Sequence, residues 1–399
     1  MNEKIVVRIP PSPTGNLHIG TARTALFNYL FAKKHGGKVL LRSEDTDKER
    51  SKKEFEDNII EGLAWLGVEY DGEMVRQSER TEIYIKYLKQ MIEGGTAYVS
   101  KEEPKEEGQR AEVIRLRNPN KKVKFNDLVR GEIEFDTTEL KDFVIAKSLE
   151  EPLYHLAVVV DDHEMGVTHI IRGEDHISNT PRQILIQEAL GLPRPEYAHI
   201  PLILAPDRSK LSKRHGATSL AEYKEKGYLP QAMVNYLALL GWNPGTEQEI
   251  FSMSELIEQF DLKKIQKGGA IFDEKKLEWV NKEHVKLLPP EEQRARLLAS
   301  IQDEPYMKGV PELDLSKICW KEVSKEDTKN HLAKVKEMLG DPDATMKYAE
   351  QVGKGNVLWP LRYALSGLEK SPDPFTLLSI LGQEESLRRV ERAIEALNQ

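Results

Sequence analysis

The sequence predicts an α/β fold: a parallel-sheet domain with a small α+β insertion, followed by a C-terminal domain made only of helices. Three observations support this. A strand–helix–strand pattern opens the chain, apolar and polar residues alternate within 113–147, and apolar residues recur at helical spacing after about residue 220. With 399 residues, the chain is long enough for two or three domains that each bury a core.

The opening pattern consists of two short β-branched strands, predicted at residues 4–9 and 38–42, with one helix between them. The helix is expected to begin near Gly20 and to end at the glycine pair 36–37, because glycine commonly follows a helix C-terminus. Parallel strands require such a crossover connection, so the pattern predicts a parallel sheet. The apolar residues of the helix recur at helical spacing: Ala22, Ala25, Leu26, Tyr29, Leu30 and Ala32.

Further elements follow the same alternation of strands and helices. Two helices are predicted around residues 55–66 and 83–91 from apolar residues three and four apart. The parallel sheet is expected to resume with apolar strands at 156–160 and 167–172. The next helix should begin close to Pro181, because proline is favoured in the first turn of a helix.

Composition narrows the classes of function. The chain has 58 lysines and arginines against 66 aspartates and glutamates, a formal net charge of −8 at pH 7. This argues mildly against nucleic-acid binding, although local basic patches can still bind a phosphate backbone. The single cysteine, Cys319, excludes a disulfide framework and a multi-cysteine zinc site. Because a strand pattern begins at once and no run of about 18 apolar residues occurs, we expect a cytoplasmic protein without signal peptide or membrane span.

The loop after the first predicted strand, residues 10–18, contains three prolines and leads into the first helix. A loop in this position faces the amino end of the following helix, where unpaired N–H groups and the helix dipole attract anions. His18 and Thr21 lie on the first turn of that helix and could donate hydrogen bonds to phosphate oxygens. Taken alone, His18 could equally be an ordinary residue at a helix start.

A dense cationic cluster occurs far downstream, at residues 210–216. It contains Lys210, Lys213 and Arg214 within one short segment. Lysines are flexible point charges suited to a pentavalent phosphate and a departing pyrophosphate. A solvated run of charges is the alternative interpretation of such a cluster. The occurrence of both motifs, in this order and on this fold pattern, favours a site that holds a triphosphate from both ends.

Together the two motifs resemble the HIGH and KMSKS motifs of class I aminoacyl-tRNA synthetases. The chain is similar to the bacterial glutamyl-tRNA synthetase family over nearly its whole length, at residues 8–15, 41–47, 76–80, 158–163, 171–183, 241–242 and 360–367. The resemblance implies a Rossmann-type catalytic domain and a glutamate–tRNA ligase. Such an enzyme uses ATP to form glutamyl-adenylate and then transfers glutamate to the 3′ end of tRNA(Glu).

The resemblance also implies a division of the chain into five segments. The catalytic domain is expected in two halves, residues 1–97 and 146–205, with a connective insertion for the acceptor end, residues 98–145, between them. A KMSKS-bearing stem-contact region is expected at residues 206–285, and a shortened helical anticodon-binding domain at residues 286–399.

The family's functional residues carry over onto matching positions of this sequence. The implied catalytic residues are His18, Thr21, Lys210 and Lys213. The implied glutamate-binding residues are Arg8, Ser12, Glu44, Tyr154 and Arg172, and the two arginines suit a dicarboxylate because each offers a planar fork of donors. The implied ATP-binding residues are Thr14, Gly15, His18, Gly20, His176, Lys213 and Arg214.

Mg²⁺ is expected to arrive with ATP, and no zinc or other protein-held metal site is expected. The histidines between 155 and 176 are too irregularly spaced to indicate one. The implied partners are L-glutamate and tRNA(Glu), no membrane partner is expected, and a monomer is expected. The sequence leaves open whether tRNA(Gln) is also charged, because the segment 320–356 is too short for the full first helical bundle of the anticodon-binding domain.

Two alternative functions remain. One is a glutamyl-queuosine tRNA(Asp) synthetase, which shares the catalytic core but lacks an anticodon-binding domain. The other is a tRNA-binding paralogue without ligase activity, which would be expected to have lost His18, Lys213 or Arg8. All three residues are present, and the chain continues for a long helical stretch after the core.

Overall fold

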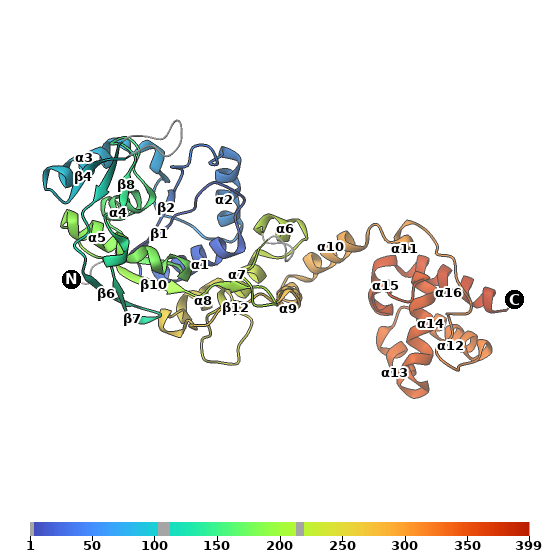
Figure 1. The fold of residues 1–399 in the computed structure, drawn as a ribbon. Helices are drawn as coiled ribbons and strands as arrows, with labels where there is room; N and C mark the ends of the chain where they lie inside the picture. Colours follow the sequence, from blue (N-terminus) through green and yellow to red (C-terminus); the bar gives the residue numbers. More distant parts are fainter. Residues whose placement is uncertain (1–3, 103–111, 213–218, 399) are drawn as a thin grey trace. The chain divides into compact units, whose positions relative to one another are not determined.

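The computed structural model describes residues 4–102, 112–212 and 219–398 (Figure 1). Contacts divide the chain into two compact units, residues 1–287 and 288–399, which we call unit 1 and unit 2. No helix among the described residues is long and apolar enough to span a membrane.

The predicted strand–helix–strand pattern at the start of unit 1 is confirmed. Strands β1 (Val6–Ile9) and β2 (Lys38–Ser43) pair in parallel, and helix α1 (Ile19–Lys34) connects them. The short strand β3 (Val75–Arg76) extends the sheet beside β2, again in parallel. Residues 7–9 of β1 and 41–43 of β2 are buried, so the carboxyl ends of both strands lie inside unit 1.

The later strands form a second sheet that begins next to β1, and we call the two sheets together the main sheet. The backbone N–H of Thr168 donates to the carbonyl of Val6 at 2.9 Å and so places β9 (His169–Gly173) next to β1. Strand β10 (Glu196–Ile200) pairs in parallel with β9, and helix α5 (Thr180–Leu190) is the crossover between them. The prediction that this helix begins at proline is confirmed.

The insertion contributes to two sheets rather than one. Strands β4 (Ala97–Lys101), β5 (Glu112–Leu116) and β8 (Val144–Ala146) form a small antiparallel sheet. Strands β6 (Lys122–Asp127) and β7 (Gly131–Asp136) form a hairpin that joins the main sheet, because β6 runs parallel to β10. Figure 1 shows this hairpin beside β10.

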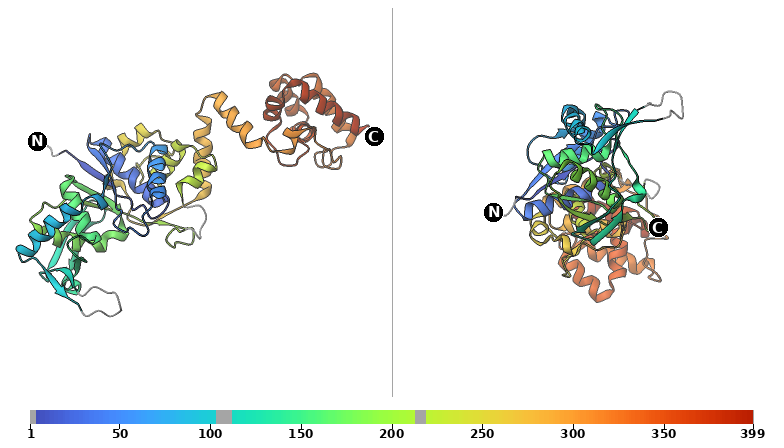
Figure 2. Two further views of the ribbon diagram at one scale, coloured as in Figure 1. Left: turned by 90° about the horizontal axis from the view of Figure 1, so that it is seen from above. Right: turned by 60° about the vertical axis from the view of Figure 1, so that its left-hand side comes forward.

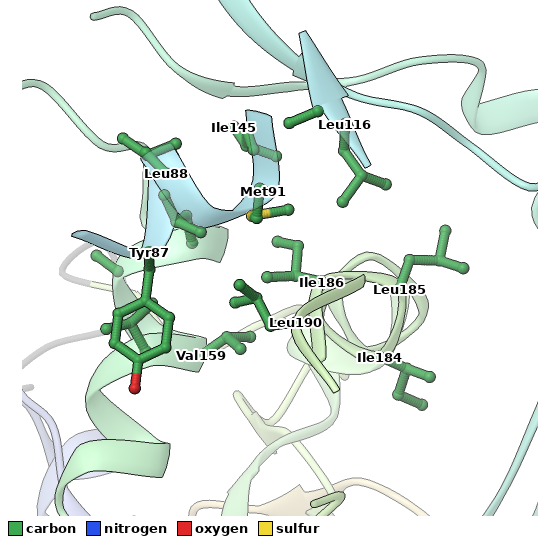
Figure 3. Close-up of a cluster of buried hydrophobic side chains, with 14 of the residues drawn as sticks. Tyr87, Leu88, Met91, Leu116, Ile145, Val159, Ile184, Leu185, Ile186 and Leu190 are labelled. Atoms are coloured by element: carbon green, nitrogen blue, oxygen red, sulfur yellow. The ribbon is translucent and has the colours of Figure 1, made fainter. Parts of the chain in front are cut away.

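One predicted strand is wrong. Residues 156–160 belong to helix α4 (Tyr154–Glu164), and every residue from 156 to 162 is buried. A helix that is apolar on all sides shows no amphipathic period, so its sequence resembles a buried strand. Figure 3 shows one of the faces that α4 buries: Val159 lies near Leu190 and Ile186 of α5 within one hydrophobic cluster.

The remaining elements of unit 1 pack around these sheets. They are α2 (Lys53–Trp65), α3 (Thr81–Glu93), β11 (Ile203–Leu204), α6 (Leu220–Glu225), α7 (Pro230–Leu239), α8 (Met253–Gln259), β12 (Ala270–Ile271) and α9 (Glu274–Lys286). The two helices predicted around residues 55–66 and 83–91 correspond to α2 and α3.

The described part of unit 2 consists of helices packed around a separate hydrophobic core, as the helical spacing predicted. Figure 2 shows these helices, coloured orange to red, from two further directions. They are α10 (Pro290–Ile301), α11 (Pro305–Lys308), α12 (Lys325–Glu337), α13 (Pro342–Val352), α14 (Lys354–Ser366), α15 (Pro374–Leu381) and α16 (Gln383–Leu397).

A buried arginine of α16, Arg389, connects three parts of unit 2. Its Nη1 donates to the carbonyl of Leu365 at 2.6 Å, near the end of α14. Its Nη2 donates to the carbonyls of Tyr306 and Gly309, at the end of α11, at 2.8 and 3.0 Å. The last carbonyls of a helix lack intrahelical donors, so this one guanidinium satisfies acceptors that would otherwise be buried without partners.

We therefore expect Arg389→Met to lower the free energy of unfolding of unit 2 by roughly 3 kcal/mol, because three buried carbonyls lose a charged donor. Hydrogen exchange, measured by mass spectrometry on the full chain, should become faster in peptides from α14 and α16 because these helices unfold more often. Arg388→Met is the matched control, since Arg388 is exposed and, within the described part of the chain, pairs with Glu385 alone. Equal effects of the two substitutions would contradict the role given to Arg389.

Candidate functional site

The first helix begins at the carboxyl edge of the sheet and carries a histidine at its N-cap. The Nδ1 atom of His18 accepts a hydrogen bond from the backbone N–H of Gly20 at 3.0 Å, which fixes the ring over the first turn of α1. The loop before it is held from two sides: Leu17 N–H donates to Asn58 Oδ1 at 2.9 Å, and Lys52 N–H donates to the Pro13 carbonyl at 3.0 Å. The helix N-terminus is therefore presented by a braced loop.

One cavity brings most of the predicted site residues together. Its lining comes from β1, the start of α1, β2, the start of α4, the end of β9 and the segment after β11. The predicted residues in this lining are Arg8, His18, Gly20, Thr21, Glu44, Tyr154, Arg172, His176 and Lys210.

The other predicted residues are placed differently. Ser12 and Thr14 line an adjoining cavity that shares Glu44 and Tyr154 with the first. Gly15 lines neither cavity. Lys213 and Arg214 lie outside the described residues, so their predicted roles remain predictions.

The floor of the cavity is a network of buried charges. Asp162 Oδ1 accepts from Arg8 Nε at 3.2 Å and from Arg42 Nη1 at 2.6 Å. Arg42 Nη2 also donates to Glu44 Oε1 at 3.0 Å. Neither Arg42 nor Asp162 was predicted as a site residue, although the paired aspartates 161–162, directly after an apolar run, were a signal for buried carboxylates.

Two arginines keep buried donors for a ligand. The Nη1 atoms of Arg8 and Arg172 are both buried and have no hydrogen-bond partner among the described residues. An unpaired N–H in the interior costs free energy, so both atoms favour an acceptor in the cavity they line. Burial lowers the pKa of Arg172, which shows how strongly its charge is removed from solvent.

Glu44 provides the opposite charge in the same cavity. Burial raises the pKa of this carboxyl group, and the Arg42 guanidinium acts against the rise. A ligand cation placed beside Glu44 would therefore be stabilised and would stabilise the carboxylate in return. Two arginine donors and one carboxylate thus suit a ligand that carries both carboxylates and an ammonium group.

Tyr154 and His176 complete this wall as neutral polar groups. Burial, followed by the charge of Glu44, raises the pKa of Tyr154 to about 12, and its hydroxyl lies 3.2 Å from His176 Nδ1. Burial, followed by the charge of Arg172, lowers the pKa of His176 to about 4. At neutral pH both groups can form hydrogen bonds without adding charge.

Lys210 adds a further cation to the lining of the cavity. The chain around it is fixed to β11, because Leu211 N–H donates to the Ile203 carbonyl at 3.1 Å. Its ammonium group donates to Asp175 Oδ2 at 2.9 Å. Asp175, which also lines the cavity, was missed in the sequence because it looked like one more acid in a polar segment.

The comparisons with known proteins agree with this geometry. The family described as tRNA synthetases class I (E and Q), catalytic domain, matches residues 4–112 and 101–279, and an anticodon binding domain matches residues 272–394. A glutamate–tRNA ligase of Caldanaerobacter subterraneus is 39% identical over 477 aligned positions, with 100% of this chain and 99% of that protein covered. One of Carboxydothermus hydrogenoformans is 41% identical, with 96% and 98% covered.

A solved structure supports the same assignment. The glutamate–tRNA ligase of Elizabethkingia meningosepticum, crystallised with its amino acid, is 33% identical, with a TM-score of 0.82 and with 99% of this chain and 100% of that chain covered. The resemblance found in the sequence is thus confirmed over the full length. The chain belongs to the class I tRNA synthetase family that includes the glutamate–tRNA ligases.

Proposed function

We propose that this protein is a glutamate–tRNA ligase that works in two steps in the cavity described above. In the first, the α-carboxylate of glutamate attacks the α-phosphorus of ATP and pyrophosphate leaves. In the second, the 2′-hydroxyl of the tRNA terminal adenosine attacks the acyl carbon and AMP leaves. The observation that carries the proposal is that Arg8, Arg172 and Glu44 converge beside the N-terminus of α1.

Glutamate binding follows from the charges of the cavity. Arg8 and Arg172 each offer a buried Nη1 donor, which suits the two carboxylates of glutamate. Glu44 would hold its ammonium group, and Tyr154 would pack beside it. Ser12, which lies in the Pro-rich loop and lines the adjoining cavity, would form part of the glutamate pocket.

The phosphates of ATP would lie at the start of α1, against His18, Gly20 and Thr21, where the helix dipole favours negative charge. His176 would contact the nucleotide, and Thr14 and Gly15 would hold it from the loop. Lys210, together with Lys213 and Arg214, would stabilise the charge that develops as pyrophosphate leaves. These groups act by electrostatics, without accepting or donating a proton.

Mg²⁺ would enter bound to the ATP phosphates. The described residues contain no group of three or more histidine, cysteine, aspartate or glutamate side chains arranged to hold a metal ion.

For the tRNA, we propose that residues 98–145 contact the acceptor end, residues 206–285 the stem and residues 286–399 the anticodon, with 1–97 and 146–205 forming the catalytic domain. The match of residues 272–394 to an anticodon binding domain supports the last assignment. The alignment with the Caldanaerobacter enzyme spans more positions than this chain has residues, so this chain has gaps in that alignment. The proposed tRNA substrate is tRNA(Glu), with tRNA(Gln) as a second candidate. The proposed oligomeric state is a monomer.

Charging assays test the proposal directly. With ATP and Mg²⁺, we expect the protein to join radiolabelled glutamate to a tRNA(Glu) transcript. A tRNA(Gln) transcript assayed in parallel shows whether the anticodon is discriminated. A tRNA(Asp) transcript carrying queuosine tests the related modifying activity. Failure to charge any of them would sink the ligase proposal and favour a paralogue that only binds tRNA.

We expect Arg8→Ala to raise the KM for glutamate by about 10–100-fold, because a buried charged hydrogen bond to a carboxylate contributes about 1.5–3 kcal/mol. The KM for ATP should change less than about threefold, since a shift of that size is under 1 kcal/mol. Steady-state charging at varied glutamate and varied ATP measures both. Arg194→Ala is the control, because this exposed arginine contacts only Lys124 and Glu188. Equal increases in both KM values would argue against the pocket assignment.

Lys213→Ala should slow adenylate formation by about 10²–10³-fold, the usual loss when one electrostatic contact to a transition state is removed. Affinity for tRNA should stay nearly unchanged. ATP–pyrophosphate exchange in the presence of tRNA reports the first quantity, and filter binding reports the second. Lys282→Ala serves as control, since Lys282 is an exposed lysine of α9 paired with Glu278. Near-normal exchange in Lys213→Ala would remove this lysine from the mechanism.

A further inference from the structure

The buried guanidinium of Arg172 is held by neutral groups. Its Nε donates to His199 Nε2 at 3.1 Å and its Nη2 donates to Thr180 Oγ1 at 2.8 Å. Among the described residues, no carboxylate forms an ion pair with it, in contrast to Arg8, which contacts Asp162. A buried charge without a counter-charge is costly, so its retention calls for a reason.

His199 can accept from Arg172 only in one tautomer. For Nε2 to accept, the ring hydrogen must lie on Nδ1, and Nδ1 is 2.6 Å from Asp127 Oδ2. The side chains of His199 and Asp127 are both fully buried. Because Arg172 Nε donates to Nε2, that atom carries no hydrogen and the ring is neutral. Burial acts in the same direction and lowers the pKa of His199, although the hydrogen bond with Asp127 opposes it. Asp127 thus selects the tautomer that accepts from Arg172.

Asp127 is itself rigidly held. Its Oδ1 accepts from the backbone N–H groups of Val129 and Arg130 at 3.0 and 2.8 Å, and its Oδ2 accepts from that of His199 at 3.1 Å. Asp127 is the last residue of β6, at the point where the β6–β7 hairpin turns, and it pairs with Tyr197 of β10. The carboxylate that orients His199 therefore comes from the insertion.

A second contact fixes the same hairpin turn to the site. Arg130 Nη2 donates to Glu174 Oε2 at 2.5 Å, and Arg130 Nε donates to the His199 carbonyl at 3.3 Å. Glu174 lies between Gly173 and Asp175, which both line the cavity. The turn thus contacts both β10 and the segment after β9, directly behind Arg172.

We infer that Asp127 and His199 are positioning residues for substrate recognition: Asp127, acting through neutral His199, fixes the Arg172 guanidinium and leaves its positive charge for a substrate carboxylate. This inference rests on the proposed role of Arg172 in binding glutamate. A carboxylate in direct contact with Arg172 would orient the fork equally well but would compete with the substrate. A neutral imidazole orients it through a hydrogen bond and adds no competing charge.

Asp127→Asn is the sharpest test because it keeps the shape of the side chain. An asparagine oxygen at the place of Oδ1 can still accept from the backbone N–H groups of Val129, Arg130 and His199, which directs the NH₂ group toward His199 Nδ1. Nδ1 must then accept, so the ring hydrogen moves to Nε2, where it faces the N–H of Arg172 Nε. Two donors then oppose each other, as when a catalytic histidine is forced into the wrong tautomer.

In charging assays, we expect Asp127→Asn to raise the KM for glutamate by at least tenfold, with the KM for ATP and for tRNA changed less than about threefold. Long-range ¹H–¹⁵N spectra of histidine-labelled protein should show His199 with its hydrogen on Nδ1 in the wild type and on Nε2 in the variant. The His199 signal is assigned by its loss in His199→Gln. The control is Asp136→Asn on the same hairpin, since the side chain of Asp136 is exposed and accepts hydrogen bonds from Thr138.

An unchanged KM for glutamate, or equal increases in the KM for glutamate and ATP, would overturn the inference. So would a wild-type spectrum with the hydrogen on Nε2. If Asp127→Asn does not fold, His199→Gln and His199→Leu decide instead: glutamine can donate to Asp127 and accept from Arg172, so its KM for glutamate should lie at least tenfold below that of the leucine variant. A wild-type enzyme that charges no glutamate would refute the proposed function, whereas the tautomer readout would still test the Asp127–His199 pair.

Discussion

The cavity at the start of α1 depends on one buried carboxylate, Asp162. Situated on α4, it accepts hydrogen bonds from Arg8 at the end of β1 and from Arg42 on β2, and Arg42 in turn contacts Glu44. Two guanidinium groups removed from water require a counter-charge, and Asp162 supplies it to both. This shared carboxylate connects the neighbouring strands to α4, so the charges that line the cavity are held in fixed positions.

The positive charges of the two arginines that line the cavity are balanced in different ways. Arg8 is oriented by a carboxylate that Arg42 already shares, whereas Arg172 is oriented by the neutral His199 and by Thr180. In both cases the side chain is fixed and one Nη atom remains without a partner among the described residues. For the proposed binding of glutamate, this arrangement would meet two demands: the donors are rigid before the substrate arrives, and they still carry charge for it.

The insertion contributes to this arrangement from a distance in sequence. Asp127 closes β6, and its carboxylate reaches His199 because β6 has joined the main sheet next to β10. A hairpin that pairs with the catalytic sheet can orient a side chain in the cavity without lining it. Hydrogen bonds thus connect the insertion to the strands that line the cavity.

The sequence by itself determined the parallel α/β fold, the helical C-terminal unit and the residues of two motifs, because strand–helix alternation, proline and glycine positions and dense cations are local signals. It misassigned residues 156–160, since an apolar run buried on all sides has the same appearance in a helix and in a strand. Only the tertiary structure decided which charges meet. Asp162 lies 154 residues from Arg8, and His199 lies 72 residues from Asp127. Their pairing depends on strand order and helix packing, and no local pattern encodes those long-range contacts.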